Sequence, residues 1–158
     1  MQNSLNSVRE FMEAMDQPIR HTPVTQLSIE ETMFRCHLLR EMFNELRESL
    51  GVYEDEFGWS MKEVRKPLDP AKLLDSLSDT LYVVLGLYHT LGLASVADAA
   101  FDEVHRANMT KKDPATGKFL KDLNGRVLKG PNYRHPDFTA ILESLQKLSG
   151  TEIFKQSK

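Results

Sequence analysis

The stretch LLDSLSDTLYVVLGLYHTLG, residues 73–92, decides the fold class. After Asp79 it is apolar on every side, a pattern typical of a helix buried in the middle of a helical protein. Asp69 and Pro70 precede it in the order typical of a helix start, and Gly92 can end it. We therefore predict a buried helix over residues 70–92 in an all-α fold.

Apolar residues recur at helical spacing in four further segments. The predicted helices cover residues 4–15, 28–50, 94–109 and 135–148. Ser28 and Glu31 form a capping-box signature at the start of the second of these helices, and Gly51 can supply its left-handed stop. The single cysteine, Cys36, lies on the apolar stripe of that helix, so we expect a thiol packed in the core. In the helix over residues 94–109, Phe101 is expected to point inward.

Three connections separate these helices. Residues 16–27 carry two prolines and predict extended chain. Residues 51–69 are mixed in composition, and we expect a connection with a short helix. In the third connection, Asn124-Gly125 is a type I′ turn signal, so we expect a short hairpin or an ordered loop near residues 115–130. The sequence thus predicts a bundle of four to five helices in a single domain, residues 1–158.

Two pairs of carboxylates are spaced one helical turn apart. Glu41 and Glu45 share one helix face, and Asp75 and Asp79 share another. Asp79 opens the apolar part of its helix, where a carboxylate is costly unless it is paired or binds a metal. Mg²⁺ is usually held by a few carboxylates with waters and substrate phosphates. The alternative is a solvated face of glutamates paired with arginines, with Asp75 favoured by the helix dipole.

Residues 105–133 form a basic segment in a chain whose formal net charge is -3. Its cations can offset phosphate charge, or they can simply keep an exposed loop soluble. The polar and basic residues that this segment collects are His105, Arg106, Asn108, Lys111, Lys112, Lys118, Lys121, Arg126, Lys129, Asn132 and Tyr133.

Several function classes are disfavoured by composition. A net charge of -3 argues against general nucleic-acid binding. The longest apolar stretch, residues 80–93, is shorter than the roughly 20 residues of a membrane span, so no membrane partner is expected. One cysteine and the lack of an apolar leader favour the cytoplasm. The sequence contains no zinc-ligand spacing and no glycine-rich phosphate loop.

Three segments together resemble the all-α NTP pyrophosphohydrolase superfamily, which includes MazG-like, dimeric dUTPase-like and phosphoribosyl-ATP pyrophosphohydrolase proteins. LLREMFNEL (38–46) is similar to the superfamily's EExxE helix, and LLDSLSDTLYVVLG (73–86) is similar to its second acidic helix. FDEVHRANMTK (101–111) with VLKGPNY (127–133) resembles the nucleotide-side segment of the phosphoribosyl-ATP pyrophosphohydrolase-like branch. The resemblance spans about residues 5–145.

The resemblance implies hydrolysis of an NTP or dNTP to the monophosphate and pyrophosphate, with Mg²⁺ or alternatively Mn²⁺. The implied metal ligands are Glu41, Glu45, Asp79 and Asp75. Glu45 and Glu41 are the implied catalytic residues, and Glu45 is the one expected to accept a proton from the attacking water. The implied substrate contacts are Asn108, Lys111, Lys129, Tyr133 and Arg106. Assembly as a homodimer or homotetramer is also implied.

The chain departs from the superfamily pattern at two acidic positions. Met42 replaces the second glutamate of EExxE, and Ser76 replaces the glutamate of ExxD. We expect Asp75 to take over from the missing glutamate, because residues i and i+4 share a face as i and i+3 do. The expected function is nucleotide-pool cleaning. The alternatives are a phosphoribosyl-ATP pyrophosphohydrolase, a catalytically weakened nucleotide-binding module, and a helical oligomerisation protein without a site.

Overall fold

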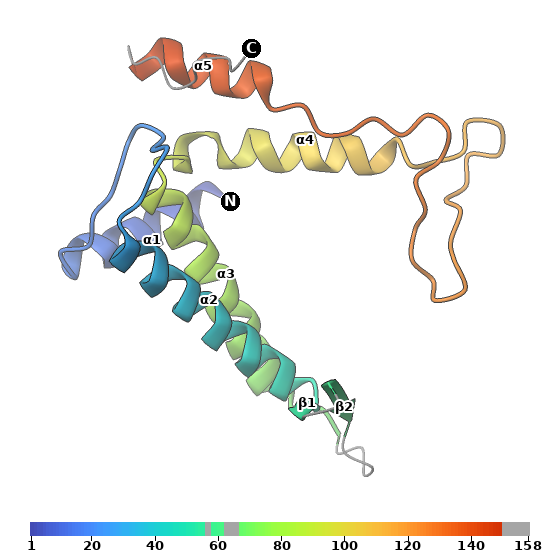
Figure 1. The fold of residues 1–158 in the computed structure, drawn as a ribbon, viewed down its shortest axis with the longest axis horizontal. Coiled ribbons are helices and arrows are strands. Elements are labelled where there is room, and N and C mark those ends of the chain that lie inside the picture. The colour runs from blue at the N-terminus through green and yellow to red at the C-terminus, as the bar shows by residue number, and fades with distance from the viewer. Residues whose placement is uncertain (56–57, 62–66, 150–158) are drawn as a thin grey trace. The chain divides into compact units, whose positions relative to one another are not determined.

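The computed structural model describes residues 1–55, 58–61 and 67–149, and within them the chain is mainly helical (Figure 1). The α-helices are α1 (Gln2–Ala14), α2 (Ile29–Ser49), α3 (Pro70–Thr90), α4 (Ala97–Met109) and α5 (Thr139–Ser149). A short 3-10 helix, η1 (Ala94–Val96), precedes α4. The predicted all-α class with four to five helices is confirmed. The chain divides into two compact units, a first unit (Met1–Ala94) and a second unit (Ser95–Lys158), which we describe separately.

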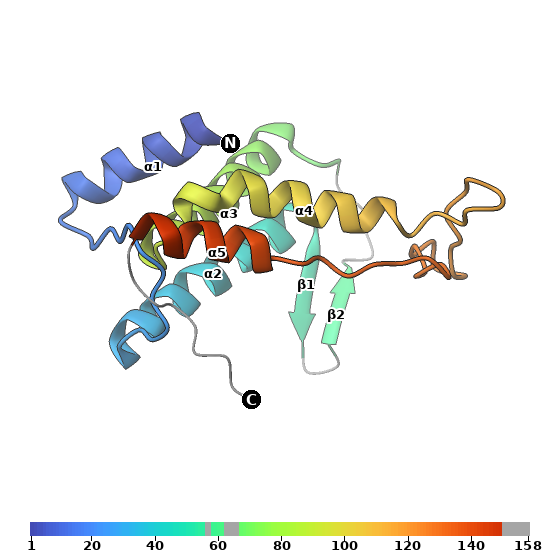
Figure 2. The same cartoon turned by 90° about the horizontal axis from the view of Figure 1, so that it is seen from above.

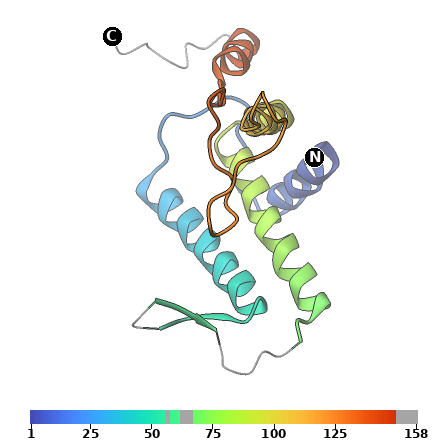
Figure 3. The same cartoon turned by 90° about the vertical axis from the view of Figure 1, so that its right-hand side faces the viewer.

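In the first unit, α2 and α3 lie side by side and run in opposite directions (Figures 1 and 3). The predicted capping box opens α2, because the Ser28 hydroxyl accepts a hydrogen bond from the Glu31 amide at 3.1 Å and the Ser28 amide donates to the Glu31 carboxylate. The Asp69 carboxylate caps α3, with Pro70 in the first helical position. Both helix starts therefore follow from local sequence chemistry.

The core of the first unit lies between α1 and α3. Leu5, Val8 and Met12 of α1 are buried, and so is Leu85 of α3. The two helices are in direct contact at Gly86, where a β-carbon would lie at an ordinary packing distance, 3.8 Å, from side-chain atoms of Val8 and Met12. The α1 side of α3 is thus a packed helix–helix contact.

Residues 16–27 cross the carboxyl end of α3 as the predicted extended connection. Arg20 donates its backbone amide to the His89 carbonyl at 3.0 Å and its guanidinium to the Thr90 carbonyl at 2.9 Å. Gly92 has φ +71°, and a β-carbon there would collide with the carbonyl oxygen of Thr22. This crossing satisfies carbonyl groups that a helix end otherwise leaves without partners.

The region after α2 contains a hairpin instead of the predicted short helix. Strands β1 (Val52–Asp55) and β2 (Gly58–Met61) pair antiparallel, with Val52 opposite Met61 and Asp55 opposite Gly58 (Figure 2). The described residues of this connection form strands and no helix, because short runs with Val, Tyr and Trp favour strands. Residues 56–57 and 62–66, which the same prediction covered, lie outside the described residues.

The α3 helix has the predicted bounds, but it is not buried on all sides. Leu74 is 68% exposed, and Leu77 and Leu81 are also more than half exposed. Helices α1 and α2 pack against α3, while the side with these leucines stays uncovered. Cys36 of α2 is exposed as well, so the prediction of a core thiol was wrong.

None of the helices in the described part of the chain is, alone, long and apolar enough to cross a membrane. Helix α3 and the segment 94–109 reach the length and apolar composition of a membrane span only when the two are counted together.

In the second unit, an ordered loop connects α4 to α5. Isolated β-bridges pair Lys112 with Phe119 and Lys121 with Val127, which confirms an ordered loop near residues 115–130. The turn is not type I′, because Gly125 has φ +80° whereas Asn124 is not left-handed. The Asp122 carboxylate instead accepts hydrogen bonds from the Asn124 and Arg126 amides.

The two helices of the second unit start later than the sequence predicts. Helix α4 begins at Ala97 because residues 94–96 form η1, and α5 begins at Thr139 because the Asp137 carboxylate caps the Thr139 amide at 2.9 Å. Phe101 is exposed, so the inward position predicted for it was wrong, and Ala97 and Ala107 are the buried residues of α4.

Candidate functional site

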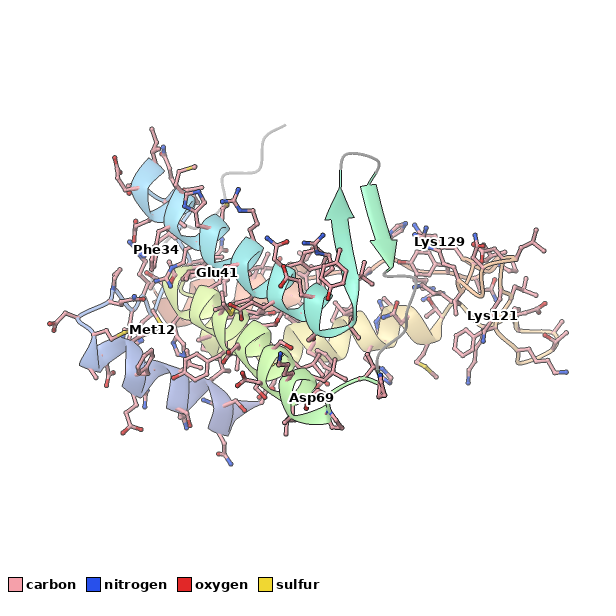
Figure 4. The ribbon with its side chains drawn as sticks, turned by 90° about the horizontal axis from the view of Figure 1, so that it is seen from below. Met12, Phe34, Glu41, Asp69, Lys121 and Lys129 are labelled. Carbon is pink, nitrogen blue, oxygen red and sulfur yellow. The ribbon has the colours of Figure 1, made fainter. Side chains whose placement is uncertain are left out.

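The predicted acidic ligands lie on the antiparallel helices α2 and α3, and Glu41 is labelled on α2 in Figure 4. All four side chains, those of Glu41, Glu45, Asp75 and Asp79, are exposed. The sequence pattern placed Asp79 in a buried helix, where a carboxylate needs a partner or a metal, but Asp79 is exposed. The prediction of a buried Asp79 was therefore wrong. Exposed carboxylates remain suitable donors for Mg²⁺, which is bound through hard oxygen ligands and retains several waters.

A contact between two serines fixes the register of α2 against α3. The hydroxyl oxygens of Ser49 and Ser76 lie 2.9 Å apart. Glu45 is four residues before Ser49, so it lies at the height of Thr80, which is four residues after Ser76. Asp79 is next to Thr80. Glu45 and Asp79 are therefore the two predicted ligands that share one height along the helix pair.

The other two predicted ligands lie on opposite sides of this height. By the same register, Glu41 is level with Val84 and Asp75 is level with Leu50. Val84 is nine residues after Asp75 on α3. Because each helical residue advances about 1.5 Å, Glu41 and Asp75 lie roughly 13 Å apart along the helix axes. Mg²⁺ binds its ligands at about 2.1 Å. Glu41 and Asp75 could therefore bind the same ion only if both side chains extended far along the helix pair toward each other. By this register, Glu45 and Asp79 are the two of the four predicted ligands that lie closest in height.

Ser76 occupies the position where the superfamily has a glutamate. Its side chain is buried, and its hydroxyl lies 2.7 Å from the Lys72 carbonyl and 2.9 Å from the Ser49 hydroxyl. Asp75 projects about 100° away around the helix, because successive residues of a helix are separated by that angle. Asp75 is exposed, so it lies on a different side of α3 from the residue that it is predicted to replace.

Across the described ranges, no three His, Cys, Asp or Glu side chains come close enough to hold a metal ion. The four acidic ligands therefore stay a prediction that rests on their helix positions and on the chemistry of their oxygens.

Most of the predicted substrate-binding residues meet in the second unit. The Lys111 ammonium lies 5.8 Å from the centre of the Tyr133 ring, and the Lys129 ammonium lies 4.9 Å from it. Lys111 also donates to the Asn108 side-chain oxygen at 2.8 Å. We call Asn108, Lys111, Lys129 and Tyr133 the Tyr133 cluster. It places two cations beside one aromatic ring, an arrangement suited to an anion that also carries a flat base.

Two further residues shape this cluster and were not predicted from the sequence. The His135 ring packs edge-on against Tyr133, with centroids 4.7 Å apart. Gly130 brings the loop against the end of α4, because a β-carbon there would lie 2.9 Å from the Lys111 carbonyl oxygen. Lys129, labelled in Figure 4, thus comes from the loop while Lys111 comes from the turn after α4.

Arg106, the fifth predicted substrate contact, is engaged by Glu103. Two guanidinium nitrogens of Arg106 donate to the two carboxylate oxygens of Glu103, each at 2.7 Å. These bonds, with the Asp137 backbone amide at 2.6 Å, lower the pKa of Glu103 to about 2. Sequence reasoning missed Glu103, although its spacing of three residues from Arg106 is the signal of a helical ion pair.

Comparison with known proteins adds one match. A family model described as phosphoribosyl-ATP pyrophosphohydrolase matches residues 8–108, which is more than half of the 158 residues. The matched range contains the four acidic residues, Arg106 and Asn108, and it ends before Lys111. No curated protein matches the chain.

Proposed function

Because the chain belongs to the phosphoribosyl-ATP pyrophosphohydrolase family of the all-α NTP pyrophosphohydrolase superfamily, we propose that it hydrolyses a nucleoside triphosphate or deoxynucleoside triphosphate to the monophosphate and pyrophosphate. The resemblance seen in the sequence is confirmed, and so is the expectation of a nucleotide pyrophosphohydrolase. The observation that carries the proposal is that the family match covers both acidic helices.

Glu45 and Asp79 are the proposed central ligands of Mg²⁺, or of Mn²⁺, with Glu41 and Asp75 contributing from the neighbouring turns. The support is the shared height of the central pair on α2 and α3. The bound cation would neutralise phosphate charge and make an attacking water more acidic. Glu45 would accept the proton of that water, and Glu41 is the second candidate for this role.

The Tyr133 cluster is the proposed contact for the substrate. Lys111 and Lys129 would offset phosphate charge, while Asn108 would hold the Lys111 ammonium and offer its amide group. The Tyr133 ring offers a face on which a base or ribose can pack. Arg106 was predicted to contact the substrate as well, but its guanidinium is bound to the Glu103 carboxylate.

A second candidate substrate is phosphoribosyl-ATP, because the family description names it. A third interpretation is a weakened member that binds a nucleotide without hydrolysing it, which Met42 and Ser76 favour. These interpretations differ in one observable: the weakened member is stabilised against heat by a nucleotide without releasing pyrophosphate.

The proposed partner besides the nucleotide is a second copy of the chain, in a homodimer or homotetramer. Leu74, Leu77 and Leu81 recur at helical spacing on α3 and are all more than half exposed. An exposed apolar row of this kind favours a protein contact. We further propose a cytoplasmic protein of one domain without nucleic-acid or membrane partners, in line with the formal charge of -3.

A substrate panel tests the proposed function. The purified chain would be incubated with each NTP, each dNTP and phosphoribosyl-ATP, and released pyrophosphate would be measured with Mg²⁺ and with a chelator. We expect Mg²⁺-dependent release for at least one nucleotide. If no nucleotide gives more pyrophosphate than an Asp79→Asn control, the chain is not a hydrolase of this kind.

A further inference from the structure

One face of α4 holds the segment that follows Tyr133. Glu103, Arg106 and Thr110 are spaced by three and four residues, so they lie on one helix face. The Thr110 hydroxyl accepts from the Arg134 amide at 2.9 Å, and the Glu103 carboxylate accepts from the Asp137 amide at 2.6 Å. We call Glu103, Arg106 and Thr110 the α4 clamp.

Arg106 completes the clamp between these two contacts. Its guanidinium donates to the His135 carbonyl at 3.3 Å while it makes both bonds to Glu103. Paired bonds between a guanidinium and a carboxylate are among the strongest that side chains form. The Glu103 side chain is only 15% exposed, against 46% for Arg106, so the carboxylate is covered by its partners.

The clamp acts directly beside the Tyr133 cluster. Tyr133 is the residue before the first clamped position, and the ring of His135, whose carbonyl is held by Arg106, packs against the Tyr133 ring. Lys111 follows Thr110, so one end of the clamp also fixes a cation of the cluster. The chain on both sides of the cluster is therefore attached to the same helix face.

We propose that Glu103 and Arg106 are positioning residues that hold Tyr133 between Lys111 and Lys129, in the arrangement that receives substrate phosphates. This inference rests on the proposed function, since it assumes that the Tyr133 cluster binds phosphate. It gives Arg106 a positioning role in place of the direct substrate contact expected from the sequence. The two roles for Arg106 predict different results.

The test compares variants of the clamp in the full chain. Glu103→Gln keeps the size of the side chain and removes its charge, and Arg106→Gln removes the partner. Thr110→Val removes the hydroxyl, while Thr110→Ser keeps it and serves as the conservative rescue. Glu13→Gln is the control, because Glu13 forms an exposed ion pair with Arg9 on α1, far along the chain from the clamp.

Three quantities would be measured for each variant: amide hydrogen exchange at residues 134–137, KM and kcat for the nucleoside triphosphate hydrolysed fastest, and the Kd of inorganic pyrophosphate by calorimetry. We expect Glu103→Gln to speed exchange of the Asp137 amide about tenfold and to raise KM and the pyrophosphate Kd about five- to tenfold, with kcat within about twofold. Arg106→Gln and Thr110→Val should shift these values in the same direction, and Thr110→Ser should not.

Two results would contradict the proposal that Glu103 and Arg106 position Tyr133. One is unchanged exchange at residue 137 in Glu103→Gln. The other is a loss of pyrophosphate affinity in Arg106→Gln that Glu103→Gln does not share, which would make Arg106 a direct contact. A wild-type chain that hydrolyses no nucleotide, yet loses pyrophosphate affinity when the clamp is altered, would refute the proposed hydrolysis while supporting the clamp.

Discussion

At the scale of single residues, the proposed metal site depends on where Glu45 and Asp79 lie. The Ser49–Ser76 contact puts them at one height on α2 and α3, one turn away from Glu41 and from Asp75 respectively. Both pairs could be predicted from their spacing in the sequence, but which members of the two pairs share a height could not. That information comes from the packing of two helices and is not contained in either helix.

Glu45→Gln and Asp79→Asn should each lower kcat by about a hundredfold or more, because each removes a charge from the central pair. Glu41→Gln and Asp75→Asn should have smaller effects, since each lies one helical turn away from the height that Glu45 and Asp79 share. Steady-state pyrophosphate release at saturating Mg²⁺ would measure this. Glu48→Gln, an exposed glutamate on the same helix, is the matched control. Equal losses for all four ligands would contradict the central role of Glu45 and Asp79.

Gly92→Ala should destabilise the fold more than Gly51→Ala does. Both glycines follow a long helix with similar φ values, +71° and +76°. A β-carbon at Gly92 would collide with the Thr22 carbonyl, whereas nothing lies within 4 Å of one at Gly51. The shared backbone cost is of order 1–2 kcal/mol, and the collision adds to it only at Gly92. Urea unfolding of both variants would measure the difference, and equal losses would contradict the crossing of residues 16–27 over α3.

At the scale of elements, helix positions could be predicted well because their start and stop signals are local. The Ser28–Glu31 capping box and the Asp69 cap with Pro70 have the predicted geometry. The β1–β2 hairpin was missed because a four-residue strand carries too few residues to distinguish its period from that of a helix. The late start of α5 at Thr139 was missed because it depends on the Asp137 cap. Glu103 was missed because one of its two partners is the backbone amide of Asp137, which is distant in sequence.

The ion pair inside α4 predicts an unusual acid titration. The hydrogen bonds from Arg106, followed by that from the Asp137 amide, lower the pKa of Glu103 from 4.5 to about 2. Because the folded pKa is the lower one, the stabilisation from ionised Glu103 is fully present above pH 4.5 and is lost as the pH falls toward about 2. NMR titration of the Glu103 carboxyl carbon would measure this. A titration midpoint near pH 4.5 would contradict the ion pair between Glu103 and Arg106.

At the scale of the whole molecule, the exposed apolar row on α3 is the feature that supports the proposed assembly with a second copy. The sequence pattern predicted that α3 is buried on all sides. In the single chain, however, no part of the protein that the structure describes covers the side of α3 with Leu74, Leu77 and Leu81. A single sequence shows that a helix is apolar, but it does not show whether the covering surface belongs to the same chain. The proposed second copy would cover this side.

Leu77→Ser combined with Leu81→Ser should shift the protein toward monomers in analytical ultracentrifugation. Each change removes an apolar side chain that is more than half exposed in one chain, so the loss should fall on association more than on folding of the chain. Leu123→Ser is the control, because Leu123 is fully exposed on the loop of the second unit. A wild-type protein that is already monomeric at micromolar concentration would contradict the proposed assembly.

Hydrolysis at the acidic residues of α2 and α3 is tested most directly by pyrophosphate release from the wild-type chain and from Asp79→Asn, side by side, with Mg²⁺ and with a chelator. We expect at least one nucleoside triphosphate, or phosphoribosyl-ATP, to yield pyrophosphate and the matching monophosphate only with the wild-type chain and Mg²⁺. Equal release by wild type and Asp79→Asn, or release that persists without a divalent cation, would contradict hydrolysis at the acidic residues of α2 and α3.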